Sequence, residues 1–306
     1  MRWGEIGYHK DRASFFKKLV GIASCFVMVI ATAPGEVRAN NTLVKISRTG
    51  EFVVGVRDKF LPVGYRNEKG DWVGLGLDIA REIHKKLEEN MGKTIKLTFL
   101  PVAPWTRTPM LVDGNVDIVC DTTAHTLRRD EVVDFSITWL VSGARLLTDI
   151  GSRIREAKDL AEKKVGAIQK SSCERVIRDL IDTGVIKPPA HVMVFPDHSR
   201  GFAALRRGII DAYCADERVL ATIKAHASNS SRWKVIGRLL TRDFYGLMTR
   251  QNDSNFLDFV NFVLIDLIRS GKFFEIYARW HGPRGVVPLP MNYETQLLLK
   301  LQSWPY

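Results

Sequence analysis

The stretch VDIVCDTTAHTLRRDEVVDFS, residues 116–136, is the part of the chain from which its fold and function can be argued. It begins as a short apolar strand, passes through the adjacent hydroxyls of Thr122 and Thr123, and continues to a basic pair that includes Arg129. Hydroxyls can donate to a carboxylate or accept from an ammonium group, and an arginine binds a carboxylate through two parallel hydrogen bonds. The pattern is compatible with an anion site. On spacing alone, however, a strand end and a helix capped by Thr126, with solvated arginines, is the simpler interpretation.

Length and composition favour a globular protein of two domains or of one large domain. The chain has 306 residues, 45% of them hydrophobic and 26% charged, which is ordinary for a soluble fold. The formal net charge is +11 at pH 7, and the chain stays basic when residues 1–39 are left out. A basic balance suits nucleic acids, membrane surfaces or small anions. Because the sequence has no basic run interleaved with aromatic residues, we expect no nucleic-acid partner.

The N-terminus has the pattern of an export signal. Lys17 and Lys18 precede an uncharged apolar stretch, residues 19–33, and the small-residue site Val37-Arg38-Ala39 follows. We therefore expect residues 1–39 to be a signal peptide that is cleaved near Ala39, which would place the mature protein in the periplasm. Residues 22–25, IASC, also resemble a lipoprotein box, but little apolar sequence precedes Cys25.

Three cysteines remain beyond the signal peptide: Cys120, Cys173 and Cys214. None lies in a CxxC pair or at metal-ligand spacing from a histidine, so we expect no metal and no cofactor. In an oxidising compartment Cys173 and Cys214 are the preferred disulfide pair, and buried free thiols are an equally good interpretation.

The order of apolar runs predicts an α/β protein with two lobes. Strands expected at residues 52–56, 95–100 and 116–120 alternate with helices expected at 77–87 and 106–112. The same alternation starts again after residue 135, and segments at 142–147 and 245–249 are expected to cross between the units. The predicted domains are lobe 1, residues 42–142 and 243–306, and lobe 2, residues 143–242.

Charged side chains recur where predicted strands end. They are Arg57, Arg107, Arg129, His198 and Asp216. Each alone is more often a surface charge, a cap or a turn residue than a ligand contact. In a fold with two lobes, together they predict a site with several cations and one carboxylate, which suits a small dicarboxylate that carries one ammonium group.

A set of motifs resembles one known family over most of the chain, from about residue 44 onward. The motifs are VVGVR at 53–57, CDTTAHTLRRDEVVDFS at 120–136, QKSSCE at 169–174, PDHSRGFAALRRG at 196–208, CADE at 214–217, SGKFFEIYARW at 270–280 and PMNYE at 290–294. Together they resemble periplasmic solute-binding proteins of bacterial ABC importers, in the polar-amino-acid group, and above all the glutamate/aspartate-binding branch. The resemblance implies the type II periplasmic-binding-protein fold, with two hinge crossings.

The resemblance also implies how the α-amino and α-carboxylate groups of a ligand are held. It assigns the α-carboxylate to Arg129, to the Ser171 hydroxyl and to the backbone amides at the start of the helix there. It assigns the α-ammonium group to Asp216 and Thr122. A desolvated carboxylate needs charge-assisted donors and a buried ammonium group needs a carboxylate, so these residue types suit their roles.

The side-chain carboxylate of the ligand is assigned to Arg57, Arg107 and His198, which is the mark of the acidic-substrate branch. His198 would help more when protonated, so binding is expected to weaken as the pH rises through its pKa. The sequence departs from the family pattern at Val63, Pro104, Ala124 and Lys170. These departures leave open another dicarboxylate or an amino-acid-like solute.

The resulting hypothesis is a monomeric binding protein, not an enzyme. It would close around an acidic amino acid and deliver it to the membrane subunits of an ABC permease. One alternative is an enzyme on the same fold, a dehydratase of cyclic dienyl acids, with Asp216, Glu217 or His198 as the proton source. Another is a sensory input domain, which the absence of an apolar run long enough to cross a membrane beyond residue 39 disfavours.

Overall fold

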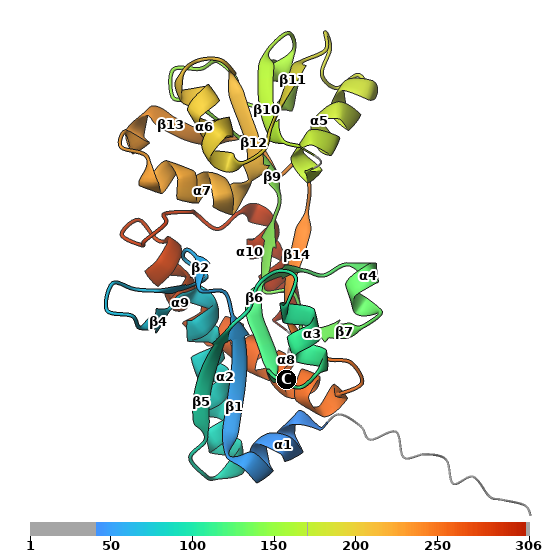
Figure 1. Ribbon diagram of the computed structural model, residues 1–306, viewed down its shortest axis with the longest axis vertical. Coiled ribbons are helices and arrows are strands. Elements are labelled where there is room, and N and C mark those ends of the chain that lie inside the picture. The colour runs from blue at the N-terminus through green and yellow to red at the C-terminus, as the bar shows by residue number, and fades with distance from the viewer. Residues whose placement is uncertain (1–40, 170, 304–306) are drawn as a thin grey trace, which may run out of the picture. The chain divides into compact units, whose positions relative to one another are not determined.

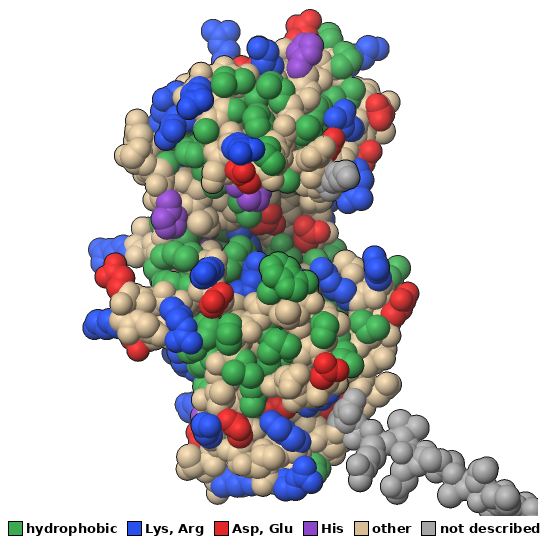
Figure 2. All heavy atoms as spheres, viewed as in Figure 1, with side chains coloured by type: hydrophobic (Ala, Val, Ile, Leu, Met, Phe, Trp, Pro, Cys, Tyr) green, Lys and Arg blue, Asp and Glu red, His purple; other side chains and the backbone are tan. Residues whose placement is uncertain are grey.

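The computed structural model describes residues 41–169 and 171–303, which form two main β-sheets with flanking helices (Figure 1). The expected signal peptide and Cys25 lie outside the described residues. No helix in the described ranges is long and apolar enough to span a bilayer. On the face shown in Figure 2, lysine and arginine side chains are interspersed with aspartates and glutamates rather than gathered into one stripe.

The first main sheet has the strand order β5-β1-β6-β14-β7, and β8 pairs with β14. Its strands are β1 (Glu51–Val56), β5 (Lys96–Pro101), β6 (Ile118–Ala124), β7 (Val133–Phe135), β8 (Leu140–Ser142) and β14 (Asp243–Arg250). β1 runs parallel to β5 and β6, whereas β14 runs antiparallel to β6, β7 and β8. The continuous apolar run of β1 fits a strand that is covered on both faces, and its Phe52 and Val54 are fully buried.

The second main sheet has the order β11-β10-β12-β9-β13. Its strands are β9 (Ala144–Asp149), β10 (Lys164–Ile168), β11 (His191–Phe195), β12 (Ala212–Asp216) and β13 (Trp233–Ile236). β10 is parallel to β11 and β12, while β9 is antiparallel to β12 and β13. Each sheet therefore joins a parallel strand group to antiparallel strands next to a crossing.

Helices and a small hairpin sheet complete the fold. The small sheet contains β2 (Lys59–Phe60), β3 (Gly64–Arg66) and β4 (Trp72–Val73). The α-helices are α1 (Thr42–Thr49), α2 (Leu75–Met91), α3 (Arg107–Val112), α4 (Leu127–Asp130), α5 (Ser172–Asp182), α6 (His198–Arg206), α7 (Glu217–His226), α8 (Ser254–Arg269), α9 (Lys272–His281) and α10 (Tyr293–Gln302). Two 3-10 turns, η1 (Ala157–Leu160) and η2 (Ser230–Arg232), lie in loops.

The chain passes from one main sheet to the other twice, at Gly143 between β8 and β9 and at residues 237–242 between β13 and β14 (Figure 1). The two passages touch each other. Ala144 N donates to Thr241 Oγ1 at 2.9 Å, and Leu240 N donates to the Ala144 carbonyl at 2.8 Å. The sequence placed the passages at residues 142–147 and 245–249, but residues 245–249 lie within β14 of the first sheet and the second passage precedes them. The lobe limits 42–142, 143–242 and 243–306 remain a prediction.

A further predicted detail, the position of His198, differs from the structure. His198 was expected beyond the end of a strand, but it is the first residue of α6, because the Asp197 side chain accepts from Arg200 N and caps that helix. In the same way α7 begins at Glu217, directly after the Asp216 side chain, which accepts from Arg218 N. Both aspartates end a preceding strand or loop and cap the next helix.

Candidate functional site

Parallel pairing of β1, β5 and β6 brings three predicted site residues to one edge of the first sheet. Arg57 follows β1 directly, Arg107 begins α3 after β5, and Thr122 lies near the end of β6. Val54 of β1 pairs with Ile118 of β6, and Val56 pairs with Pro101 of β5. The carboxyl ends of parallel strands meet at one edge, and α/β proteins bind ligands there.

A buried carboxylate that the sequence analysis did not single out connects these residues. Asp121 has no exposed surface and lies inside β6. Its Oδ2 atom accepts from Arg107 Nη1 at 3.0 Å and lies 3.1 Å from Arg57 Nε. Its Oδ1 atom accepts from the Thr122 backbone N–H at 2.7 Å. We call Arg57, Arg107 and Asp121 the arginine–aspartate cluster. The sequence signal that could have identified Asp121 is a charged residue that follows the apolar run of β6 directly.

The cluster is an interior feature of the first sheet rather than a surface ion pair. Arg107 is only 6% exposed, and desolvation lowers the pKa of its guanidinium, an effect that Asp121 opposes. Arg57 is half-buried, and its guanidinium carbon lies 3.6 Å from the centre of the Phe60 ring. Arg57 and Arg107 are therefore more buried than the partners of an ordinary surface ion pair.

Arg129 lies close to the cluster, on the short helix α4. Its Nη1 atom donates to the Ala124 carbonyl at 2.6 Å, which holds the half-buried guanidinium against the end of β6. Its charge is one of those that lower the pKa of Arg107.

The adjacent hydroxyls of Thr122 and Thr123 differ in their surroundings. Thr122 is half-buried, whereas Thr123 is fully buried and its Oγ1 atom has no hydrogen-bond partner within the described ranges.

Asp216 ends β12 in the second sheet and accepts hydrogen bonds from side chains of β8 and β14 in the first. Its Oδ2 atom accepts from Ser142 Oγ at 2.8 Å and from the Tyr245 hydroxyl at 3.2 Å. The nearby Asp243 has a raised pKa, mainly through desolvation and then through the charge of Asp216, while Arg129 acts in the opposite direction. Asp243 thus lies within electrostatic reach of predicted site residues from both sheets.

His198 and Ser171 lie at helix starts on the second sheet. His198 Nδ1 is 2.8 Å from the Tyr213 hydroxyl. Although the residue is exposed, desolvation on the packed side of the ring lowers its pKa, and Asp197 and Asp216 act in the opposite direction. The proton that was expected to assist an anionic ligand is therefore bound only at lower pH. The Ser171 side chain accepts from Glu174 N at 3.2 Å, which is the geometry of a helix cap.

Six of the seven predicted site residues fall into two groups, each linked by hydrogen bonds or by charge effects. Arg57, Arg107 and Thr122 meet at Asp121, and the charge of Arg129 acts on Arg107. Asp216 acts on His198 and, together with Arg129, on Asp243. The hydrogen bond described for Ser171 stays within its own helix. Whether any of the seven binds a ligand remains a prediction.

The disulfide that was preferred from the sequence is not present. Cys120, Cys173 and Cys214 are buried free thiols, in line with the second interpretation. Burial, reinforced by a hydrogen bond with Cys173, raises the pKa of Cys214 well above its usual value. A protonated, buried thiol is a poor participant in disulfide exchange. Within residues 41–169 and 171–303, no cluster of three or more His, Cys, Asp or Glu side chains is placed to hold a metal ion.

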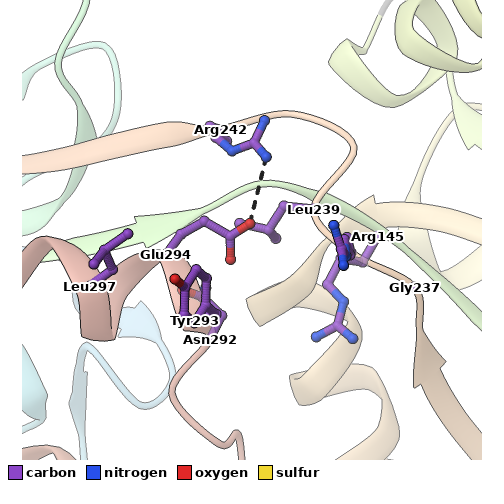
Figure 3. A pocket seen from close by; sticks show the side chains of 9 residues that line it. Arg145, Gly237, Leu239, Arg242, Asn292, Tyr293, Glu294 and Leu297 are labelled. Atoms are coloured by element: carbon purple, nitrogen blue, oxygen red, sulfur yellow. Dashed lines mark ion pairs between the residues drawn. The ribbon is translucent and has the colours of Figure 1, made fainter.

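A separate cavity of about 800 Å³ lies beside the second crossing (Figure 3). It is lined by Arg145 of β9, by residues 237–239 and Arg242, and by Asn292, Tyr293, Glu294 and Leu297 at the start of α10. Arg242 and Glu294 form an ion pair at 3.7 Å across it, and Asn292 Nδ2 donates to the Val141 carbonyl at 2.8 Å. Its lining contains none of the seven predicted site residues, so this cavity is distinct from the candidate ligand site.

The two sheets and their two connections define the type II fold of periplasmic binding proteins. The structure resembles that of the L-cystine solute receptor of Neisseria gonorrhoeae in its unliganded open conformation, with a TM-score of 0.65 at 16% identity over 81% of this chain and 99% of that one. It also resembles an ancestral amino acid-binding protein described as a precursor of cyclohexadienyl dehydratase, with a TM-score of 0.58 at 24% identity over 78% and 99% of the two chains.

The chain belongs to the bacterial extracellular solute-binding proteins, family 3, whose family model matches residues 52–283. It is 28% identical over 262 residues to the glutamate/aspartate import solute-binding protein of Salmonella typhimurium, covering 85% of this chain and 86% of that protein. It is also 28% identical over 277 residues to an ABC transporter glutamine-binding protein of Bacillus subtilis, covering 86% and 97%. The predicted family is confirmed, and these relatives are named as binding proteins.

Proposed function

We propose that this protein captures an acidic α-amino acid, glutamate or aspartate, in the periplasm and delivers it to the membrane subunits of an ABC importer. The observation that carries the proposal is the presence of two complementary groups: the surplus of positive charge in the arginine–aspartate cluster, and the carboxylate of Asp216 at the end of β12. An acidic amino acid carries the complementary groups, two carboxylates and one ammonium group. The name of the Salmonella typhimurium relative supports the same ligand class.

The proposed mechanism is closure of lobe 2, residues 143–242, on lobe 1, residues 42–142 and 243–306. The hinge would be the two passages that touch at Ala144 and Thr241. Arg129 and Thr122 would approach the ligand from the first sheet, and Asp216 from the second. Closure removes water, which strengthens each ionic contact, and it presents a surface to a permease that the open protein lacks.

An amide ligand is the alternative that the relatives support, because one of them is named as glutamine-binding. The enzyme alternative rests on the precursor of cyclohexadienyl dehydratase among the structural neighbours, which are similar in fold. Of the three candidate proton sources, Asp216, Glu217 and His198, Glu217 is buried, with Oε2 3.3 Å from Arg145 Nη1 and Oε1 bonded to Asn292. These contacts occupy both carboxylate oxygens of Glu217, and the curated relatives are named as binding proteins, so we favour binding without chemistry.

A thermal-shift screen tests the proposal. The purified protein is heated with acidic, amide, basic and aromatic amino acids and with dicarboxylates that lack an amino group. Stabilisation by glutamate or aspartate, lost in Arg107→Ala and in Asp216→Ala, is the expected result. If dicarboxylates without an amino group stabilise the protein, and Asp216→Ala leaves that stabilisation unchanged, the ligand is a non-amino solute and not an amino acid. Consumption of a chorismate-derived cyclic acid would instead support the enzyme.

A further inference from the structure

Asp121 is a protein carboxylate that pairs with both Arg57 and Arg107. Both of its oxygens are engaged and its side chain has no contact with solvent. Oδ1 accepts from Arg57 Nε at 3.3 Å and from Thr122 N at 2.7 Å, and Oδ2 accepts from Arg107 Nη1 at 3.0 Å. A buried carboxylate held by two guanidinium groups and a backbone amide is a fixed counter-ion for both arginines.

The arginines keep unused donors on the side that Asp121 does not occupy. Arg57 contacts Asp121 through Nε, and Arg107 contacts it through Nη1. In the described part of the chain, no hydrogen bond uses the Nη atoms of Arg57 or the Nη2 atom of Arg107. A guanidinium group has five N–H donors in a rigid plane, so fixing one of them also fixes the direction of the others. Asp121 thus positions the donors that a ligand would meet.

The charge of the cluster follows from its composition. Two guanidinium groups and one carboxylate leave a single surplus positive charge, and buried charges are stable when they are paired. We infer that Asp121 determines specificity: it positions Arg57 and Arg107 and reduces their joint charge so that the site takes an α-amino acid whose side chain ends in one negative charge. The inference rests on the proposed function, because it concerns the side-chain end of the same ligand.

If Asp121 is the counter-ion of the two arginines, one result is expected that would not be expected of two arginines without a counter-ion. In Arg57→Gln the remaining Arg107 and Asp121 cancel each other, so the preference for glutamate over glutamine should disappear. Without a counter-ion, Arg107 alone would still favour glutamate. In the double variant Arg57→Gln/Asp121→Asn one arginine is again uncompensated, and the preference for glutamate should return.

Calorimetric titration with glutamate and glutamine measures the ratio of the two affinities in each variant. We expect Arg57→Gln to lower the glutamate-to-glutamine ratio by at least about tenfold, and the double variant to recover most of that loss. Asp117 provides a matched control, because it is also fully buried and paired with cations, at 2.7 Å from Lys45 Nζ and 3.3 Å from Arg250 Nη2. Arg57→Gln/Asp117→Asn should show no recovery.

The outcomes separate this inference from the proposed function. If the wild-type protein binds neither glutamate nor glutamine, both fail. If it prefers glutamate, but Arg57→Gln keeps that preference or Asp121→Asn does not restore it, only the inference about Asp121 fails. Arg57 is half-buried, so its substitution is expected to leave the protein folded and gives a decisive result even if the double variant does not fold.

Discussion

The carboxylate of Asp216 accepts a hydrogen bond from the Tyr245 hydroxyl at 3.2 Å, on the same Oδ2 atom that Ser142 Oγ contacts at 2.8 Å. Asp216 ends a strand of the second sheet, whereas Tyr245 lies on β14 and Ser142 ends β8 in the first. Desolvation and the charge of Asp216 both raise the pKa of Tyr245, so its hydroxyl remains a donor. An ammonium group bound at Asp216 would therefore act on a carboxylate that is attached to β8 and β14, the strands of the first sheet that adjoin the two passages.

Asp216→Asn should show how much of the affinity depends on the ammonium group of the proposed ligand and how much on its carboxylates. The amide keeps the shape and one acceptor of the side chain but removes its charge, so affinity for α-amino acids is expected to fall about 100-fold. A dicarboxylate without an amino group should not lose affinity. Titration calorimetry measures both, with Asp149→Asn as the control, since Asp149 is half-buried and pairs with Arg232 at 2.7 Å. Equal losses for both ligands would contradict an ammonium site at Asp216.

The state of the cysteines can be checked by thiol titration in a Cys25→Ser background. The three described cysteines are buried, and burial raises the pKa values of Cys120 and Cys214, so an aromatic disulfide reagent should react with them at least about a hundredfold more slowly in the native protein than in denaturant. The unfolded protein should yield all three thiols. A yield of one thiol would instead indicate the Cys173–Cys214 disulfide.

His281 should make the fold sensitive to mild acid. Desolvation and the neighbouring Arg218 lower the pKa of this buried histidine to about 3, against about 6.5 in an unfolded chain. Below the higher value the unfolded state binds a proton that the native state does not, so stability falls with decreasing pH. The loss from this group is about 2 kcal/mol at about pH 5. Urea unfolding at about pH 7 and pH 5 measures it.

The matched variants for this measurement are His281→Gln and His226→Gln. The first should reduce the loss of stability between the two pH values, because the group that titrates is gone. The second should keep it, because His226 is exposed. If both variants lose the same stability as the wild-type protein on acidification, His281 is not the group responsible.

Much of the fold follows from local sequence. The apolar run at 52–56 becomes β1, and the amphipathic pattern interrupted at Gly271 becomes α8 and α9, separated at that glycine, which has a φ of 81°. The start of α10 also carried a local signal, because Asn292 accepts from Thr295 N and caps this helix. Its packing against Val141, through a Thr295 hydroxyl at 3.1 Å, joins residues that are 154 positions apart and is not visible in either segment alone.

The candidate site was predictable in its residue types but not in its pairings. Arg57 and Arg107 could be chosen because each stands where a predicted strand ends or a helix begins. Their common partner Asp121 could not be assigned, because the contact requires β1 and β6 to be neighbours and α3 to start at the same edge of the sheet. A sequence interpretation that counts only the cations therefore overestimates the positive charge that a ligand would meet.

Gly143→Ala tests whether the proposed hinge depends on close contact between the two passages. A Cβ atom at Gly143 would lie 2.0 Å from the Thr241 carbonyl oxygen and 2.7 Å from its carbon, so the backbone itself has to move. We expect a loss of about 1–3 kcal/mol in the free energy of unfolding and weaker ligand binding, since the two segments are pushed apart where the protein would bend.

Gly151→Ala is the control, because the nearest atom to its Cβ would be Asp149 Oδ1 at 3.4 Å, an ordinary contact. If Gly143→Ala is as stable as the control and binds the ligand with wild-type affinity, the passages do not need to touch, and the hinge has to be placed elsewhere in the chain.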